Sequence, residues 1–227
     1  MKLVQKLFYV CFAVFLVIGA AGCSAFSGSN SSGGEKSSQA DQINKEGKTL
    51  IVYFSQPETS SPDDMTKEED NSTVVIDGKV LGNTQYVAEV IQKQTNVDIA
   101  RIEPQTPYTT DHKALVDLAK QEKYEEARPA IKDIPNIEQY DTIFIGYPIW
   151  WADMPMVMYS FFDKYDLSGK TIIPFSTHGG SGLADTVDAI KKAEPNATVI
   201  EDAYSVSRDD VQEAQPEILS WLKSLGY

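Results

Sequence analysis

From Lys48 onward, the chain alternates between short apolar runs and longer segments whose apolar positions recur at helical spacing. The short runs are rich in β-branched and aromatic residues, which is typical of buried strands. We predict strands over 49–55, 97–102, 140–147, 170–177 and 197–206, and helices over 83–95, 111–127, 155–165, 182–195 and 209–225. This alternation predicts one α/β domain over 48–227, with a five-stranded parallel sheet and helices on both faces.

The connection between the first predicted strand and the first helix is far longer than an ordinary loop of this kind. Ser55 ends the strand and Gly82–Gln85 opens the helix. Their hydroxyl, amide and backbone N–H groups suit an anion, although the second stretch alone is equally a plain helix cap. Residues 57–81 form an insertion, in which two apolar half-strands flank Asp77-Gly78 and predict a hairpin. No G-x-x-x-x-G-K-[ST] motif occurs, which excludes a Walker-type phosphate loop.

Two further segments that follow strands are unusual. Trp150 and Trp151 follow the third strand, and two rings at this point are not both expected to point inward. The stretch Ser176–Gly182, "STHGGSG", follows the fourth strand, and its glycines allow close approach of the backbone to a ligand. Taken singly, these stretches are also explained as core packing and as a flexible connection. Ligands of open parallel sheets bind outside the carboxyl ends of the strands, which makes the three segments one candidate cleft.

Composition excludes several classes of function. The formal net charge of −13 argues against nucleic acid as a partner and suits either a basic protein partner or simple solubility. Cys11 and Cys23 both precede residue 24, so the domain has no disulfide and no thiol nucleophile. The two histidines, His112 and His178, give no zinc ligand set, and no metal is expected.

The N-terminal segment is interpreted as a targeting signal. Residues 1–22 contain Lys2, Lys6 and an uncharged apolar run that leads to "GAAGC", and this layout resembles a bacterial lipoprotein signal peptide. The resemblance implies lipidation of Cys23, although Ala20 stands where such signals usually carry Leu. A membrane-spanning helix is the alternative, but the apolar run is short for a span. Residues 23–47 then form the lipidated cysteine and a flexible Ser- and Gly-rich tether.

The motifs after the strands resemble those of a known family. "IVYFS", "GNT", "GYPIWWADMP" and "STHGGSG" are similar to motifs of the flavodoxin-like FMN-binding proteins, in particular the short-chain group with a Pro-x-Trp-Trp loop and a Thr-His-Gly-Gly-Ser-Gly loop. The resemblance covers about Lys48 to Tyr227 and implies the strand order 2-1-3-4-5. It implies that the FMN phosphate is held by Ser55, Gln56, Asn83, Thr84 and Gln85. It also implies that the isoalloxazine ring is flanked by Pro148, Ile149, Trp150, Trp151, Thr177, His178, Gly179, Gly180 and Gly182.

The chain departs from the family pattern at two places. The phosphate loop of the family is usually compact, whereas residues 57–81 interrupt it here, and Gln56 replaces a residue that often supplies a hydroxyl or a positive charge. Gly is common after the tryptophan pair, whereas this chain has Ala152-Asp153. The Asp153 carboxylate is expected at the rim of the cleft or as a solvated surface charge.

These observations predict a monomeric FMN electron carrier, held by its lipid on the outer, extracytoplasmic face of the cell membrane. Its partners are expected to be redox proteins, and no catalytic acid or base is required. One alternative is an FMN-dependent NAD(P)H or quinone oxidoreductase on the same fold, although no G-x-G-x-x-G fingerprint supports a dedicated nucleotide domain. Another is a lipoprotein that captures flavin without redox chemistry. A serine hydrolase is disfavoured, because the elbow G-x-S-x-G needs Gly where Leu183 stands.

Overall fold

The computed structural model describes residue 43 and residues 46–134 and 136–227. The predicted signal peptide, Cys23 and most of the predicted tether lie outside these residues. In the described part of the chain, no helix combines the length and the apolar character needed to cross a membrane.

The main sheet is parallel and six-stranded, and it contains β1 (Thr49–Tyr53), β4 (Asp98–Arg101), β5 (Thr142–Pro148), β6 (Thr171–His178), β7 (Thr198–Val199) and β8 (Tyr204–Ser207). The strand order is β4-β1-β5-β6-β7, and β8 also pairs with β6. The α/β class and the parallel sheet are confirmed. The predicted number of five strands is wrong, because the segment predicted as one strand over 197–206 forms two.

The break between β7 and β8 has a local cause. Val199 lies opposite Ile172 and Tyr204 lies opposite Phe175, which leaves two more residues on the edge segment than on β6. The middle of that β6 stretch contains Pro174, which has no N–H to donate to a neighbouring strand. The charged pair Glu201-Asp202 forms the resulting bend, and both pieces stay on the same side of β6.

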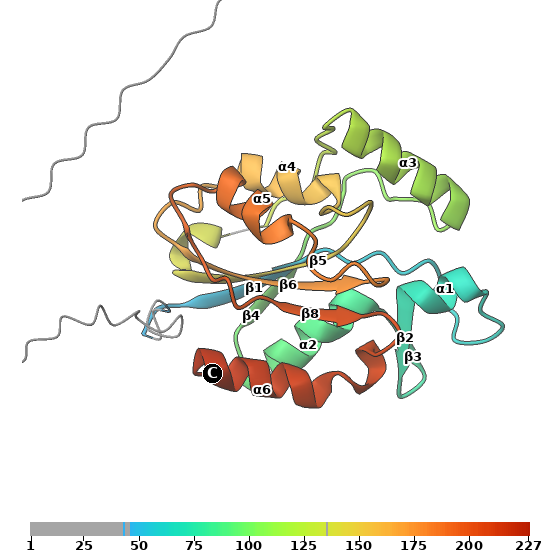
Figure 1. The fold of residues 1–227 in the computed structure, drawn as a ribbon, viewed down its shortest axis with the longest axis horizontal. Coiled ribbons are helices and arrows are strands. Elements are labelled where there is room, and N and C mark those ends of the chain that lie inside the picture. Colours follow the sequence, from blue (N-terminus) through green and yellow to red (C-terminus); the bar gives the residue numbers. More distant parts are fainter. Residues whose placement is uncertain (1–42, 44–45, 135) are drawn as a thin grey trace, which may run out of the picture. The chain divides into compact units, whose positions relative to one another are not determined.

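Helices cover both faces of the sheet (Figure 1). On one face lie α2 (Asn83–Thr95) and α6 (Gln215–Leu225), and on the other lie α3 (His112–Tyr124), α4 (Met156–Lys164) and α5 (Thr186–Ala193). Side chains of β1 alternate between the two cores: Ile51 packs with the α2 and α6 side, and Leu50 and Val52 pack with the α4 and α5 side. This alternation is the period of two that strand geometry imposes on a sheet buried on both faces.

The segment 57–81 adds a small helix and a hairpin beside the sheet, and its Val74 and Leu81 side chains join the core on the α2 side. It contains the helix α1 (Lys67–Ser72) and the strands β2 (Thr73–Ile76) and β3 (Lys79–Gly82), which pair antiparallel. Asp77 and Gly78 connect the two strands with φ angles of 51° and 75°, as a two-residue hairpin turn requires. The helix α1 was not predicted.

The ends of several helices differ from the predicted ranges. The last predicted helix, 209–225, is a short 3₁₀ turn at Val211–Glu213 followed by α6, which places Pro216 in the first turn of a new helix. Proline is compatible with that position, because the first N–H groups of a helix have no partner inside it. A second 3₁₀ turn, Ile137–Gln139, precedes β5.

Candidate functional site

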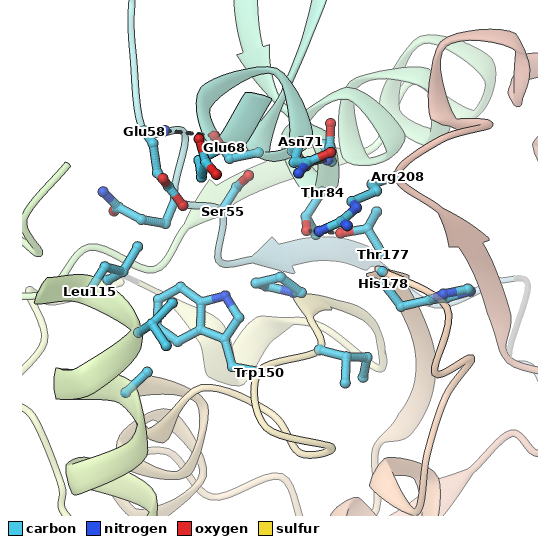
Figure 2. Close-up of a pocket in the computed structure, with 18 of the residues that line it drawn as sticks. Ser55, Glu58, Glu68, Asn71, Thr84, Leu115, Trp150, Thr177, His178 and Arg208 are labelled. Atoms are coloured by element: carbon cyan, nitrogen blue, oxygen red, sulfur yellow. Dashed lines mark hydrogen bonds between the residues drawn. The ribbon is translucent and has the colours of Figure 1, made fainter. Parts of the chain in front are cut away.

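A pocket of about 370 Å³ lies at the carboxyl ends of the strands (Figure 2). Segments that follow β1, β5, β6 and β8 contribute to it, together with residues of the insertion 57–81 and of α3. Eleven of the fourteen expected site residues line this pocket, namely Ser55, Gln56, Asn83, Thr84, Pro148, Ile149, Trp150, Trp151, Thr177, His178 and Gly179. Gln85, Gly180 and Gly182 do not line it.

The insertion does not separate the two halves of the expected phosphate loop. A Cβ atom added to Gly82 would lie 2.2 Å from Ser55 Oγ and 3.2 Å from Ser55 Cβ. The chain therefore leaves the sheet after Ser55, makes the detour through α1, β2 and β3, and returns in contact with its starting point. Ser55 is buried, and its carbonyl oxygen accepts a hydrogen bond of 2.5 Å from Arg101 Nη2 of β4.

The helix α2 begins at this junction without a side-chain cap. Its N-cap is Gly82, which has no side chain that could accept from the first N–H groups of the helix. These N–H groups have no partner within the helix, and Asn83 and Thr84 line the pocket, so the helix N-terminus can donate to a ligand there. The side chain of Gln85 instead donates to Glu89 over 2.8 Å along the helix surface, so that only its backbone belongs to the helix N-terminus.

Two buried side chains of the first turn of α2 face other parts of the site. Thr84 Oγ1 lies 2.8 Å from Thr177 Oγ1, which joins α2 to the end of β6. Asn83 Nδ2 donates to the carbonyl of Asn71 in α1 over 2.9 Å. Asn83 Oδ1 is buried and has no hydrogen-bond partner among the described residues. An unpaired buried acceptor is costly, so a ligand hydroxyl or N–H group would satisfy it.

The two tryptophans have different surroundings. Trp150 is half-buried and makes edge-to-face contacts with Phe54 and Tyr108, at centroid distances of 5.6 and 5.5 Å. Trp151 is 47% exposed, and its Nε1 donates to the carbonyl of Val116 in α3. Both tryptophans line the pocket, but they differ in burial: Trp150 packs inward as the aromatic wall, whereas Trp151 is exposed and packs against α3.

A strained two-residue turn holds this pair of rings in place. Trp150 and Asp153 exchange backbone hydrogen bonds of 2.9 and 3.0 Å, and Trp151 and Ala152 between them have φ angles of 53° and 57°. The Asp153 carboxylate accepts from Met154 N and from Tyr159 Oη, both over 2.8 Å. Asp153 does not line the pocket, so its carboxylate stabilises the turn and is neither a rim charge nor freely solvated.

The loop after β6 contributes a histidine that is held in one orientation. Gly180 N donates to His178 Nδ1 over 2.9 Å, so the proton of the neutral ring lies on Nε2. Burial lowers the pKa of His178 below its usual value, and the Asp210 carboxylate opposes this with a smaller effect. The side chain is therefore neutral at pH 7. Gly180 and Gly182 have positive φ angles of 113° and 60° and turn the chain away from the pocket.

Sequence reasoning missed one wall of the pocket and its positive charge. The missed lining residues are Glu58, Glu68, Asn71 and Ser72 of the insertion, His112, Leu115, Val116 and Ala119 of α3, and Arg208 after β8. The buried Glu58 carboxylate lies 3.0 Å from His112 Nδ1 and links the insertion to α3. A signal for α1 was present in the sequence, because Thr66 and Glu69 form a reciprocal capping box. His112 and Arg208 had no such signal.

These features define an α/β protein whose ligand pocket lies between the loops at the carboxyl edge of a parallel sheet. A family model described as flavodoxin matches residues 72–221, which is more than half of the chain. The chain therefore belongs to the flavodoxin family. The matched range begins at the end of α1, so β1 and Ser55 lie before it. A search of curated proteins gave no match.

Solved structures resemble the fold over most of the domain. A candidate flavoprotein from Bacteroides eggerthii is 28% identical with a TM-score of 0.59, and the alignment covers 79% of this chain and 98% of that one. A second candidate flavoprotein, from Bacteroides uniformis, is 24% identical with a TM-score of 0.55 and coverages of 78% and 98%. A Lactobacillus acidophilus flavoprotein in complex with FMN is 21% identical with a TM-score of 0.53 and coverages of 78% and 99%.

Proposed function

We propose that this protein binds FMN in the pocket and carries electrons between redox partners. The observation that carries the proposal is the convergence of three loops that lie far apart in the sequence. Ser55, Trp150 and Thr177 follow or end β1, β5 and β6, and all three line one pocket. Membership of the flavodoxin family and the likeness of fold to a flavoprotein in complex with FMN support the same cofactor.

The residues of the pocket fit the three chemical parts of FMN. The uncapped N-terminus of α2 and the hydroxyl of Ser55 suit the phosphate group. The unpaired Oδ1 of Asn83 needs a donor, and the hydroxyl groups of a ribityl chain are donors. Trp150 provides an aromatic surface for a flat ring system, because burial of aromatic area gives affinity without charge.

FMN, when bound, supplies reversible uptake and release of electrons. The protein side chains contribute binding, exclusion of water and electrostatics. The His178 ring is neutral and adds no positive charge, and the chain as a whole has a net charge of −13. Because negative surroundings disfavour additional negative charge on a bound group, we expect the protein to lower the reduction potential of the flavin relative to free FMN.

The test of this function is expression of residues 24–227, followed by titration with FMN and a redox titration. We expect a yellow protein with a flavin absorption spectrum, quenched flavin fluorescence and reversible reduction at a potential below that of free FMN. Trp150→Ala should weaken FMN binding, whereas Trp221→Ala, which removes a core indole that does not line the pocket, serves as the control for loss of stability. A colourless protein that does not respond to FMN would contradict the proposal.

A reductase with a substrate of its own is the second candidate, and the Glu58–His112 pair favours it. A carboxylate and an imidazole 3.0 Å apart in a pocket wall are groups that can deliver a proton to a substrate. Rapid reduction of the purified protein by NAD(P)H alone, with turnover of a quinone that His112→Gln slows, would establish this activity. Absence of reduction by NAD(P)H leaves the carrier as the function.

We further propose that Cys23 is lipidated and tethers the domain to the outer face of the membrane. The support is the layout of residues 1–22 and the polar composition of 24–47. The test is fractionation of cells that express the full chain. The wild-type protein should sediment with membranes and partition into detergent, and Cys23→Ala should lose the lipid. A redox partner with a basic surface would complement the acidic domain.

A further inference from the structure

Arg208 reaches the pocket from a segment that no sequence motif connects with the site. Its backbone N–H donates to the carbonyl of His178 over 2.8 Å, which extends the pairing of β8 with β6 by one residue. The register places Arg208 beside the loop that follows β6. Because the strand pairing fixes its backbone, the side chain starts from a defined position at the carboxyl edge of the sheet.

The absence of a side chain at Gly179 leaves space for the Arg208 side chain at the pocket wall. A Cβ atom at Gly179 would lie 3.1 Å from Arg208 Nη1 and 3.2 Å from Arg208 Cζ. Most real Cβ contacts are longer, so any other residue at 179 would force the guanidinium to shift. Gly179 therefore has a role beyond the expected one: it leaves room for a cationic side chain.

The guanidinium lies on the side of the pocket that the N-terminus of α2 occupies. Figure 2 draws Arg208 among Thr84, Thr177 and Asn71, on the opposite side from Leu115. Thr84 belongs to the first turn of α2, and its hydroxyl is bonded to that of Thr177. The donors of the helix N-terminus and the donors of Arg208 thus converge on one end of the pocket.

The charges around the pocket make Arg208 the side chain that can attract an anionic ligand. Among the described lining residues, Arg208 is the one with a permanent positive charge, whereas Glu58 and Glu68 are both acidic. A phosphate dianion that enters an acidic protein meets repulsion from these carboxylates. The carboxylate nearest to Arg208 among the ion pairs is that of Asp209, which lies 3.9 Å from Nε and is 77% exposed. Such an exposed pair is weak, so Arg208 remains available to a ligand.

We infer that Arg208 determines the specificity of the pocket for a phosphorylated flavin over its unphosphorylated form. The planar guanidinium donates charge-assisted hydrogen bonds to the terminal phosphate, in the fork geometry that suits a phosphate group. The N–H groups of α2 hold the same phosphate from another direction. This inference rests on the proposed binding of FMN and adds to it the residue that reads the phosphate.

The test compares the affinities for FMN and for riboflavin, which differ only in the phosphate. Dissociation constants from fluorescence quenching or calorimetry are measured for the wild type, Arg208→Gln and Arg208→Lys. Arg128→Gln is the matched control, because the Arg128 side chain has a similar exposure, pairs with Asp163 and does not line the pocket. Thermal unfolding of each variant without flavin checks that it is folded.

We expect Arg208→Gln to weaken FMN binding by about tenfold or more, as loss of a charged hydrogen bond would. The riboflavin affinity of Arg208→Gln should differ little from that of the wild type. Arg208→Lys should keep part of the preference for FMN over riboflavin, and Arg128→Gln should keep all of it. Salt provides a second measurement. Added salt screens both the attraction of Arg208 and the repulsion of the carboxylates, so the ratio of the FMN affinities of the wild type and Arg208→Gln should fall as salt increases, whereas the ratio of their riboflavin affinities should not change.

Two other results would overturn the inference, and they differ in what they say about function. If Arg208→Gln weakens FMN and riboflavin equally, or leaves both unchanged, Arg208 does not read the phosphate, and the proposed FMN site stands. If the wild type binds neither flavin, the proposed function fails and the inference fails with it.

Discussion

The hydroxyl oxygens of Thr84 and Thr177 lie 2.8 Å apart in a buried contact between the first turn of α2 and the end of β6. The two residues come from the two loops to which we assign the phosphate and the ring of the cofactor. Both side chains are nearly inaccessible to solvent, with 1% and 3% exposure. This contact joins the two segments at one end of the pocket.

Thr84→Val should destabilise the fold and weaken FMN binding. The substitution leaves the buried Thr177 hydroxyl without its partner, which costs about 1–3 kcal/mol. Thr177→Val should have a similar effect, and the double variant should be less destabilised than the sum of the two, because neither hydroxyl then remains unpaired. Denaturant unfolding of the four proteins measures this coupling. Additive effects of the two substitutions would show that the contact contributes nothing to stability.

Gly82→Ala should disturb the junction of the insertion with the sheet. The φ angle of Gly82 is −71°, so alanine is conformationally allowed and the obstacle is steric. The new Cβ would lie 2.2 Å from Ser55 Oγ and 3.2 Å from Pro57 Cδ. We expect a loss of about 1–3 kcal/mol in the free energy of unfolding, as for other overpacked sites, and weaker FMN binding.

The second substitution Ser55→Gly separates this steric cause from others. It removes both Ser55 atoms that the new Cβ meets, so Gly82→Ala should cost less stability in the Ser55→Gly background than in the wild type. Gly78→Ala is the contrasting control, because a Cβ at Gly78 meets no atom within 4 Å and only the φ angle of 75° opposes it. If the double variant loses as much unfolding free energy as the two single variants together, the steric contact is refuted.

Ala152→Gly should stabilise the protein. Ala152 is exposed and has a φ angle of 57°, where glycine lacks the steric penalty of about 1–2 kcal/mol that other residues experience. Greater freedom of glycine in the unfolded chain offsets about 0.4–1 kcal/mol of this gain. We therefore expect a net gain of roughly 0.5–1 kcal/mol, or a Tm about 1–4 °C higher in a domain of this size. Ala119→Gly in α3 is the control and should lower the Tm, because Ala119 is helical and buried.

The sequence was sufficient to predict the parallel sheet, apart from the division of its last strand, and eleven of the twenty residues that line the pocket. The strands of the sheet interior, such as β5, are short and mostly apolar runs of the length of a strand, and such a run can be recognised from its own residues. The Ser55, Trp150 and Thr177 segments could be placed at one edge, because parallel strands end on the same side. The division of the last strand was not predictable from its own residues, since the register opposite Pro174 determines it.

The remaining parts of the site depend on contacts between distant segments. Arg208 lies in a polar stretch, and only its pairing with His178 brings it to the pocket. His112 opens a helix and lines the pocket, and its partner Glu58 comes from the insertion, 54 residues earlier in the chain. Neither relationship leaves a pattern in a single sequence, because side chains that meet across loops need no fixed spacing along the chain.

The stability of the protein should depend on pH through Glu194, which lies at the end of α5 and is 7% exposed. Burial raises the pKa of its carboxyl group to about 7, and the carboxylates of Asp166 and Asp163 add to this effect. Because the usual value of 4.5 applies in the unfolded chain, the folded state binds more protons between these two values. The contribution of Glu194 to stability is therefore most favourable below about pH 4.5 and is lost as the pH rises toward 7.

Glu194→Gln should remove this dependence, because glutamine stays neutral at every pH. We expect the variant to have a higher Tm than the wild type at pH 8, and the difference should shrink steadily toward pH 4.5. Glu138→Gln, at an exposed site of the 3₁₀ turn before β5, measures the effect of removing one surface charge from an acidic protein. At pH 8, the increase in Tm caused by Glu194→Gln must exceed the change in Tm caused by Glu138→Gln. A Tm difference that is the same at pH 5 and pH 8 would show that Glu194 ionises normally in the folded protein, and the burial of its charge would then have to be relieved by water or by movement of the α5 terminus.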